Sequence, residues 1–117
     1  MCLALVAVGA HARYPLVVVA NRDEFHRRPT APAQWWPEGW YGGRDLQAGG
    51  TWLGVAPTGR WALLTNVREP SRHDPRAPSR GALVPAFLAG DDAPAAAVAA
   101  PIAATIAAAG SGNGFNL

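Results

Sequence analysis

Two short apolar runs at the N-terminus constrain the fold more than any other feature of the sequence. Residues 2–8 and residues 16–20 are rich in leucine, valine and alanine, and a short link separates them. Runs of this length and composition predict two β-strands, and the short link predicts that they form a hairpin. The second run is apolar throughout, which predicts that both of its faces are buried. Such a hairpin places Cys2 at the free end of its first strand, beside the polar residues that follow the second.

The middle of the chain is predicted to contain a long loop and a second hairpin. Residues 26–50 include three prolines and two pairs of glycines, and this composition predicts a loop without regular structure. The aromatic residues of the loop predict that it packs against the protein. Residues 51–56 and 60–66 predict a third and a fourth strand, which the turn sequence at 57–59 joins.

The last third of the chain is predicted to be mainly helical. Ser79 is suited to cap a helix over residues 81–88, where apolar residues recur at helical spacing before Gly90. Asp91 or Asp92 is suited to cap a second, alanine-rich helix that reaches residue 109. Residues 115–117 resemble the opening of a further strand.

This order of elements predicts an α+β fold with a largely antiparallel sheet and helices on one side. The last predicted strand stops where the chain stops, which predicts an incomplete domain. An incomplete domain leaves a sheet face or edge uncovered, and such a surface favours pairing with a second copy.

The composition excludes several classes of function. The chain has 117 residues, enough for one small domain, and a formal charge of +2. All of its basic residues are arginines, and they are scattered along the sequence except in two short segments. A protein that binds nucleic acid usually carries a denser basic patch, so we predict no nucleic-acid partner. No apolar run approaches the ~20 residues of a membrane-spanning helix. The apolar start lacks the basic region of a signal peptide. Its single cysteine forbids an internal disulfide and fits a reducing, cytoplasmic location.

Cys2 is the strongest candidate for a reactive residue. Removal of Met1, which is usual before a small residue, leaves Cys2 with a free α-amine. An α-amine has a pKa of ~7.7–8.0, so part of it is unprotonated near neutral pH and can take the thiol proton. The structural alternative is that Cys2 is a small buried residue at the start of a strand.

Three further polar residues are candidates for the same chemistry. Asp23 could hold the α-amine by a charge-assisted hydrogen bond, and Arg22 could favour the thiolate. If the strand continues, Asn21 and Asp23 share one face and Arg22 points to the other. The alternative is a strand-end turn with a surface ion pair. Asn66 could donate to an oxyanion, but asparagine also commonly ends strands.

The tryptophans and histidines are weaker signals. Trp36 and Trp52 could line a pocket for an apolar ligand, while at least two of the four tryptophans among residues 35–52 are expected in the core. The three histidines have no metal-ligand spacing with each other or with Cys2, so we predict no metal site.

Several segments, spread from one end of the chain to the other, together resemble the NRDE family, which includes the transport and Golgi organisation protein 2 group. They are Met1-Cys2, ANRDEF at 20–25 followed by Arg28-Pro29, GGTWLG at 49–54, LTN at 64–66, the SRG segment at 79–81 with the apolar residues to Leu88, and NGFNL at 113–117. The family is similar to N-terminal-nucleophile hydrolases, whose fold is an αββα sandwich. The resemblance implies that residues 1–117 are the N-terminal part of one longer domain of this kind.

The resemblance also implies roles for individual residues. By position, Cys2 matches the nucleophile, Asp23 matches the acid that holds its amine, and Asn66 matches the oxyanion asparagine. Arg22 matches more loosely, because those hydrolases place their arginine differently in the motif.

Two functions are therefore open. One is a cysteine amidohydrolase that acts on linear C–N amide bonds and needs no cofactor. The other is a non-enzymatic carrier of haem or acyl lipid, because eukaryotic members of the family are linked to haem trafficking and acyl-CoA balance. In a haem carrier, Cys2 or His26 would ligate the iron. Either function implies a small-molecule amide, acyl or haem ligand, and its expected contacts are Asn21, Trp36, Trp52 and Thr65.

Overall fold

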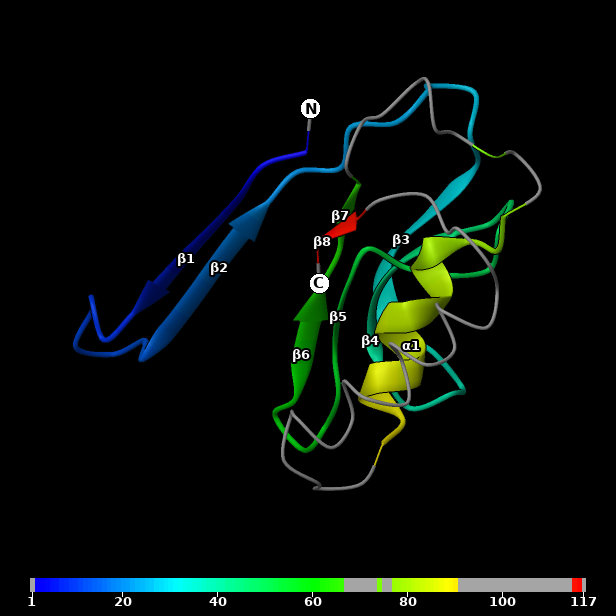
Figure 1. Ribbon diagram of the computed structural model, residues 1–117. Helices are drawn as coiled ribbons and strands as arrows, with labels where there is room; N and C mark the ends of the chain where they lie inside the picture. Colours follow the sequence, from blue (N-terminus) through cyan, green and yellow to red (C-terminus); the bar gives the residue numbers. More distant parts are fainter. Residues whose placement is uncertain (1, 67–73, 75–76, 91–114, 117) are drawn as a thin grey trace.

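A computed structural model describes residues 2–66, 74, 77–90 and 115–116, and Figure 1 shows the arrangement of their elements. The predicted N-terminal hairpin is confirmed. Strands β1 (Ala4–Val8) and β2 (Leu16–Ala20) pair antiparallel. Gly9, at a φ of 64°, begins the connecting turn, and its N–H donates to the carbonyl of Pro15 at 2.8 Å. A positive φ costs glycine little, so the reversal is unstrained.

A second hairpin occupies the segment predicted to be a long loop, so that prediction is wrong. Strands β3 (Thr30–Trp35) and β4 (Tyr41–Asp45) pair antiparallel there. Strand β3 lies at the edge of its sheet, where one side of the strand needs no hydrogen-bond partner, so Pro32 is tolerated. The register between the two strands shifts between Ala31 and Gln34, on either side of this proline.

Strands β5 (Leu53–Val55) and β6 (Trp61–Leu63) complete a four-stranded sheet in the order β3–β4–β5–β6. The turn predicted between them is confirmed. Ala56 donates its N–H to the carbonyl of Arg60 at 2.8 Å, and Gly59 adopts a φ of 85°.

The strand predicted over residues 60–66 is divided in two. Strand β7 (Thr65–Asn66) leaves the four-stranded sheet and pairs with β8 (Phe115–Asn116), which confirms the predicted C-terminal strand. The division occurs at Leu64, whose side chain is buried and whose N–H donates to the carbonyl of Trp52 at 2.7 Å.

The predicted helix after Ser79 is present but shorter. A 3₁₀ turn (Arg80–Ala82) leads into α1 (Leu83–Leu88). Ser79 occupies the N-cap position, but its hydroxyl makes no capping hydrogen bond, contrary to the prediction.

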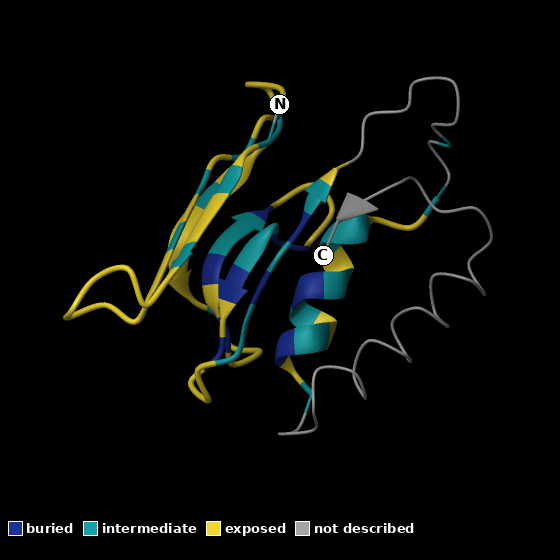
Figure 2. Ribbon diagram, turned by 60° about the vertical axis from the view of Figure 1, so that its left-hand side comes forward, coloured by how far each residue is buried: buried dark blue, intermediate teal, exposed yellow. Residues whose placement is uncertain are grey.

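The hydrophobic core lies between α1 and one face of the four-stranded sheet (Figure 2). Gly54 on β5 lies directly under the helix, because a Cβ built on it would be 2.7 Å from Cδ1 of Leu88. The helix therefore approaches the sheet closely only because this position has no side chain. The buried apolar residues are Trp40, Ala56, Ala62, Leu64, Val84 and Leu88.

The β1–β2 hairpin stands on the side of the sheet opposite α1, and its turn points away from the remaining elements (Figures 1 and 2). The prediction that β2 is buried on both faces is wrong for this structure. Val19 is 61% exposed and Leu16 is 39% exposed. On β1, Leu5 is 60% exposed and Val8 is 77% exposed. Large apolar side chains of this hairpin are therefore exposed on both strands.

The structure confirms an α+β class with mainly antiparallel sheets and a helix on one side. The second predicted helix, up to residue 109, and the glycine-rich segment at 110–114 lie outside the described residues. Within the described ranges, no helix combines the length and apolarity needed to cross a membrane.

We expect Leu88→Ala to lower the free energy of unfolding by about 2–5 kcal/mol, because it opens a cavity between α1 and the sheet. Urea denaturation followed by tryptophan fluorescence measures this loss. Leu46→Ala is the matched control, because Leu46 is 56% exposed and should lose less than about 0.5 kcal/mol. Equal losses in the two variants would contradict the described core.

Candidate functional site

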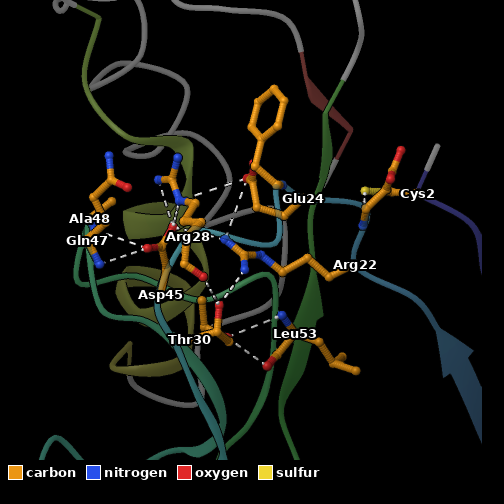
Figure 3. Close-up of polar contacts among 12 residues, drawn as sticks. Cys2, Arg22, Glu24, Arg28, Thr30, Asp45, Gln47, Ala48 and Leu53 are labelled. Carbon is orange, nitrogen blue, oxygen red and sulfur yellow. Dashed lines mark hydrogen bonds and ion pairs between the residues drawn. The ribbon is translucent and has the colours of Figure 1, made fainter.

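The open end of the β1–β2 hairpin holds the N-terminal cysteine (Figure 3). Leu3 donates its N–H to Oδ1 of Asn21 at 2.8 Å, and Asn21 donates its N–H to the carbonyl of Leu3 at 3.1 Å. Beyond this pair of residues, the N–H of Asp23 donates to Sγ of Cys2 at 3.5 Å. The Cys2 side chain is partly exposed. The structure thus brings Cys2, Asn21 and Asp23 together.

Arg22 contacts a different set of residues, as the predicted alternation implies. Its Nη1 donates to Oγ1 of Thr30 at 2.6 Å, and its Nη2 donates to Oδ2 of Asp45 at 3.2 Å. Its Cζ lies over the ring of Trp52, 4.8 Å from the centroid, which is a cation–π contact. In Figure 3 the side chain extends from the neighbourhood of Cys2 to Asp45.

Asp45 is the centre of a network of charges at the end of β4. Its Oδ2 accepts from Nε of Arg28 at 2.7 Å as well as from Arg22. Its Oδ1 accepts the N–H groups of Gln47 and Ala48 at 2.9 and 3.1 Å. Burial alone would raise the pKa of the Asp45 carboxyl, but these N–H groups and the Arg28 guanidinium together lower it below the usual value.

Glu24 completes the network. Its Oε2 lies 3.5 Å from Nη2 of Arg22 and 3.8 Å from Nε of Arg28.

Sequence reasoning missed Asp45 because it lies in the segment expected to be a loop. Glu24 and Arg28 were visible only as members of the family motif.

A polar cavity of about 370 Å³ opens beside this network. Arg22, Trp52 and Asn66 meet in it, although they come from three separate segments of the chain. The carboxamide of Asn66 makes no hydrogen bond within the described part of the chain. The full lining consists of Arg22, Glu24, Arg28, Asp45, Gln47, Gly50, Thr51, Trp52, Leu64, Asn66, Asp74, Ala77, Pro78, Ser79, Arg80 and Gly81.

Three of the four expected ligand contacts do not line this cavity, and the first of them, Asn21, is hydrogen-bonded to Leu3. Trp36 donates its Nε1–H to the carbonyl of Gly42 at 2.8 Å and packs against Trp40, and it does not line the cavity. Thr65 pairs with Asn116 in the β7–β8 ladder and is likewise not among the lining residues. Of the tryptophans expected in the core, Trp40 is buried and Trp36 packs against it.

A second, shallower cavity of about 500 Å³ is also lined by Arg22. Phe25 and His26 line it together with Trp52. Among the described residues, no group of three or more histidine, cysteine or acidic side chains is placed to hold a metal ion.

One wall of the polar cavity depends on a close contact between two backbone segments. The N–H of Thr51 donates to the carbonyl of Gly81 at 3.0 Å, and Thr51 is almost fully buried. A Cβ on Gly50 would lie 2.4 Å from the backbone of Gly81. The absence of a side chain at Gly50 therefore lets Ser79 and Arg80 reach the cavity.

Comparison with known proteins relates the whole chain to one family. A family model described as Transport and Golgi organisation 2 matches residues 1–117. The Transport and Golgi organization 2 homolog of Mus musculus is 43% identical over 83 residues, which are 67% of this chain and 30% of the mouse protein. The Homo sapiens homolog is 42% identical with the same coverage. The chain spans about 30% of the length of these relatives.

A more distant relative gives the same result. The Transport and Golgi organization protein 2 of Drosophila melanogaster is 37% identical over 84 residues, which are 64% of this chain and 29% of that protein. No solved structure matches the chain. These matches confirm the family resemblance that was drawn from the sequence segments.

We expect Gly50→Ala to destabilise the protein by about 1–3 kcal/mol, because the new methyl group collides with backbone that cannot move independently. Gly81→Ala is the control, since a Cβ there meets its nearest neighbour only at 3.4 Å. Thermal unfolding of both variants by circular dichroism compares them. A larger loss in Gly81→Ala would contradict the described packing of the two segments.

We expect Asp45→Asn to lower the free energy of unfolding at pH 7 by about 1–3 kcal/mol, because two guanidinium groups lose their shared carboxylate. The pKa of Asp45 is lowered from 3.8 in the folded state, so its contribution is full above that pH and is lost as the pH falls through the folded value. The variant should therefore lose stability less steeply in acid. Urea denaturation between pH 2 and pH 7 measures both effects, and Glu38→Gln, at an exposed ion pair, should change little.

Proposed function

We propose that this chain, which belongs to the Transport and Golgi organisation 2 family, carries the nucleophile of a cysteine amidohydrolase acting on linear C–N amide bonds. One observation carries the proposal. Cys2 lies at the open end of the hairpin with its Sγ 3.5 Å from the N–H of Asp23. The next residue towards β2, Arg22, extends from this point to the polar cavity that Asn66 also lines.

The proposed reaction has two steps. The α-amine that removal of Met1 leaves on Cys2 takes the thiol proton, and the sulfur attacks the carbonyl carbon. An S–C bond forms, the C–N bond breaks, and the amine product leaves with that proton. Water then adds to the thioester, which releases the carboxylic acid and returns a proton to the sulfur.

The other residues of the site have supporting roles in this proposal. The carboxylate of Asp23 orients the α-amine by a charge-assisted hydrogen bond. The carboxamide of Asn66, together with a backbone N–H, donates to the oxyanion that forms during the attack. The guanidinium of Arg22 supports the thiolate from the side of the cavity. A free thiol nucleophile also requires a reducing compartment, so we place this reaction in the cytoplasm.

The proposed fold is the αββα sandwich of N-terminal-nucleophile hydrolases, with residues 1–117 as the N-terminal part of one domain. Two uncovered β-surfaces support it. The hairpin exposes apolar residues such as Val6 and Val19. The face of the four-stranded sheet opposite α1 exposes Trp35, Tyr41 and Val55, which neighbour one another across three strands. Sheets that pack face to face in a sandwich bury surfaces of this kind.

We expect Cys2→Ala to abolish amide hydrolysis while the unfolding transition stays unchanged, because the side chain is only partly buried. The activity of the full chain on a panel of N-acyl amines, together with intact mass, tests this. The mass should show that Met1 is absent. Retained turnover in Cys2→Ala, or a retained Met1 in an active preparation, would contradict the mechanism.

A haem or acyl-lipid carrier is the second candidate, and one feature favours it. Phe25 is 83% exposed and lines the shallow second cavity with His26 and Trp52. An exposed ring beside an imidazole suits the face and the iron of a haem.

Titration of the full chain with haem should then give a saturable absorbance change at one equivalent. His26→Ala should abolish this change, whereas His11→Ala, in the hairpin turn, should preserve it. Binding that does not saturate, or that is equal in both variants, would exclude this carrier role for His26.

A further inference from the structure

The register of the β1–β2 hairpin indicates which residue a continued ladder would place opposite Cys2. The ladder ends where the first residue of β1 pairs with the last residue of β2. Extending the register by one residue pairs Leu3 with Asn21. Extending it by two residues would pair Cys2 with Arg22. In the structure, Sγ of Cys2 accepts instead from the N–H of Asp23 at 3.5 Å.

The side chain of Asn21 takes the place of a backbone carbonyl at this end of the hairpin. The N–H of Asn21 donates to the carbonyl of Leu3 at 3.1 Å, which is one bond of a hydrogen-bonded pair. In a regular antiparallel pair, the N–H of Leu3 would return a bond to the backbone carbonyl of Asn21. Here it donates to Oδ1 of the Asn21 side chain at 2.8 Å. Leu3 is thus held in register although the chain after Asn21 leaves the ladder.

Packing contributes little to the position of Leu3. Its side chain is 59% exposed, whereas the core residue Val84 is fully buried. A single peptide bond joins Cys2 to Leu3, so their Cα atoms lie about 3.8 Å apart and the position of Leu3 limits where Sγ can lie. The two hydrogen bonds to Asn21 therefore restrain the segment from which the thiol extends.

Asn21 and its neighbour Arg22 have different surroundings. Arg22 lines both of the cavities described above and reaches Asp45 on the four-stranded sheet. Asn21 lines neither of these two cavities, and its described hydrogen bonds go to the backbone of Leu3. This placement suits a residue that holds the hairpin end, and it differs from the ligand contact expected from the sequence.

We propose that Asn21 is a positioning residue for the thiol of Cys2. Its Oδ1 holds Leu3 while the following backbone leaves the ladder, so that Sγ meets the N–H of Asp23 and not the side chain of Arg22. The consequence for catalysis rests on the proposed hydrolase function. In that reaction Asn21 touches neither the substrate nor the reacting atoms, and it acts through the backbone of Leu3.

Amide hydrogen exchange of the full chain, measured by NMR, tests this placement without any turnover. Asn21→Leu keeps the branched shape of the side chain and removes the acceptor for the Leu3 N–H. We expect the amides of Leu3 and Asp23 to exchange at least about tenfold faster in this variant, because local opening becomes easier. The amide of Gly9 donates to the carbonyl of Pro15 at the other end of the hairpin, and it should keep its exchange rate.

Further variants separate the acceptor from the bulk of the side chain. Asn21→Ala removes the same acceptor with a smaller side chain and should give the same result as Asn21→Leu. Asn21→Asp keeps an acceptor oxygen and should restore slow exchange of the Leu3 amide. Gln34→Leu is the matched control, since it removes an exposed carboxamide from β3 and should change none of these rates. Thermal unfolding followed by tryptophan fluorescence confirms that each variant keeps its core.

Steady-state kinetics separate positioning from binding. The substrate is the N-acyl amine that the unaltered chain hydrolyses fastest. Asn21→Leu should lower kcat at least about tenfold and change KM less than about twofold, because a displaced nucleophile loses rate while the contacts of the substrate remain. Asn21→Asp should recover part of the lost kcat.

Unchanged exchange at Leu3 and Asp23 in the folded Asn21→Leu variant would overturn the inference, as would a raised KM with an unchanged kcat, which indicates a ligand contact. Equal acceleration at Gly9 would also overturn it, because Asn21 would then only stabilise the hairpin. Failure of the proposed function is distinguishable. Faster exchange confined to Leu3 and Asp23 in a chain that hydrolyses no amide retains the placement and rejects the enzyme. Hydrolysis that Asn21→Leu leaves unchanged does the reverse.

Discussion

The shared carboxylate of Asp45 fixes the geometry on which the candidate site depends. It lies at the end of β4, and it binds Arg22 and Arg28 from the segment that follows β2. These bonds connect the hairpin that carries Cys2 to the four-stranded sheet. Guanidinium groups so anchored keep their remaining donors in fixed directions, which is the condition for selective recognition of a ligand.

Glycine at two positions complements this polar anchor. Gly54 lets α1 lie close to the sheet, and Gly50 lets the segment before α1 meet the loop after β4. The first contact builds the hydrophobic core, and the second builds a wall of the cavity. Packing and site are therefore coupled through the short segment from Ser79 to α1, whose helical end is buried and whose other end lines the cavity.

Short sequence patterns predicted the parts of the fold that depend on residues close together in the sequence. The β1–β2 hairpin, the turn at 57–59 and the strand at the C-terminal end were all predicted from short apolar runs and turn residues. The β3–β4 hairpin was missed because Pro32 indicates a loop, and only its position at a sheet edge makes it compatible with a strand. That position is a property of the tertiary structure.

The candidate site was predictable to a similar extent. The positions of Cys2, Asp23 and Arg22 follow from strand alternation and the hairpin register. The meeting of Arg22, Trp52 and Asn66 in one cavity depends on long-range packing, and no spacing in the sequence indicates it. Asp45 had no sequence signal, because its importance arises from the two arginines that converge on it.

The isolation of the β1–β2 hairpin has a consequence for the thiol that it carries. A hairpin of two strands without a packing layer is marginally stable in water. Local opening of the hairpin therefore requires less free energy than unfolding of the core around Val84. The time that Cys2 spends beside Asp23 is then set by this local equilibrium, so any surface that covers the hairpin also raises the population of the aligned nucleophile.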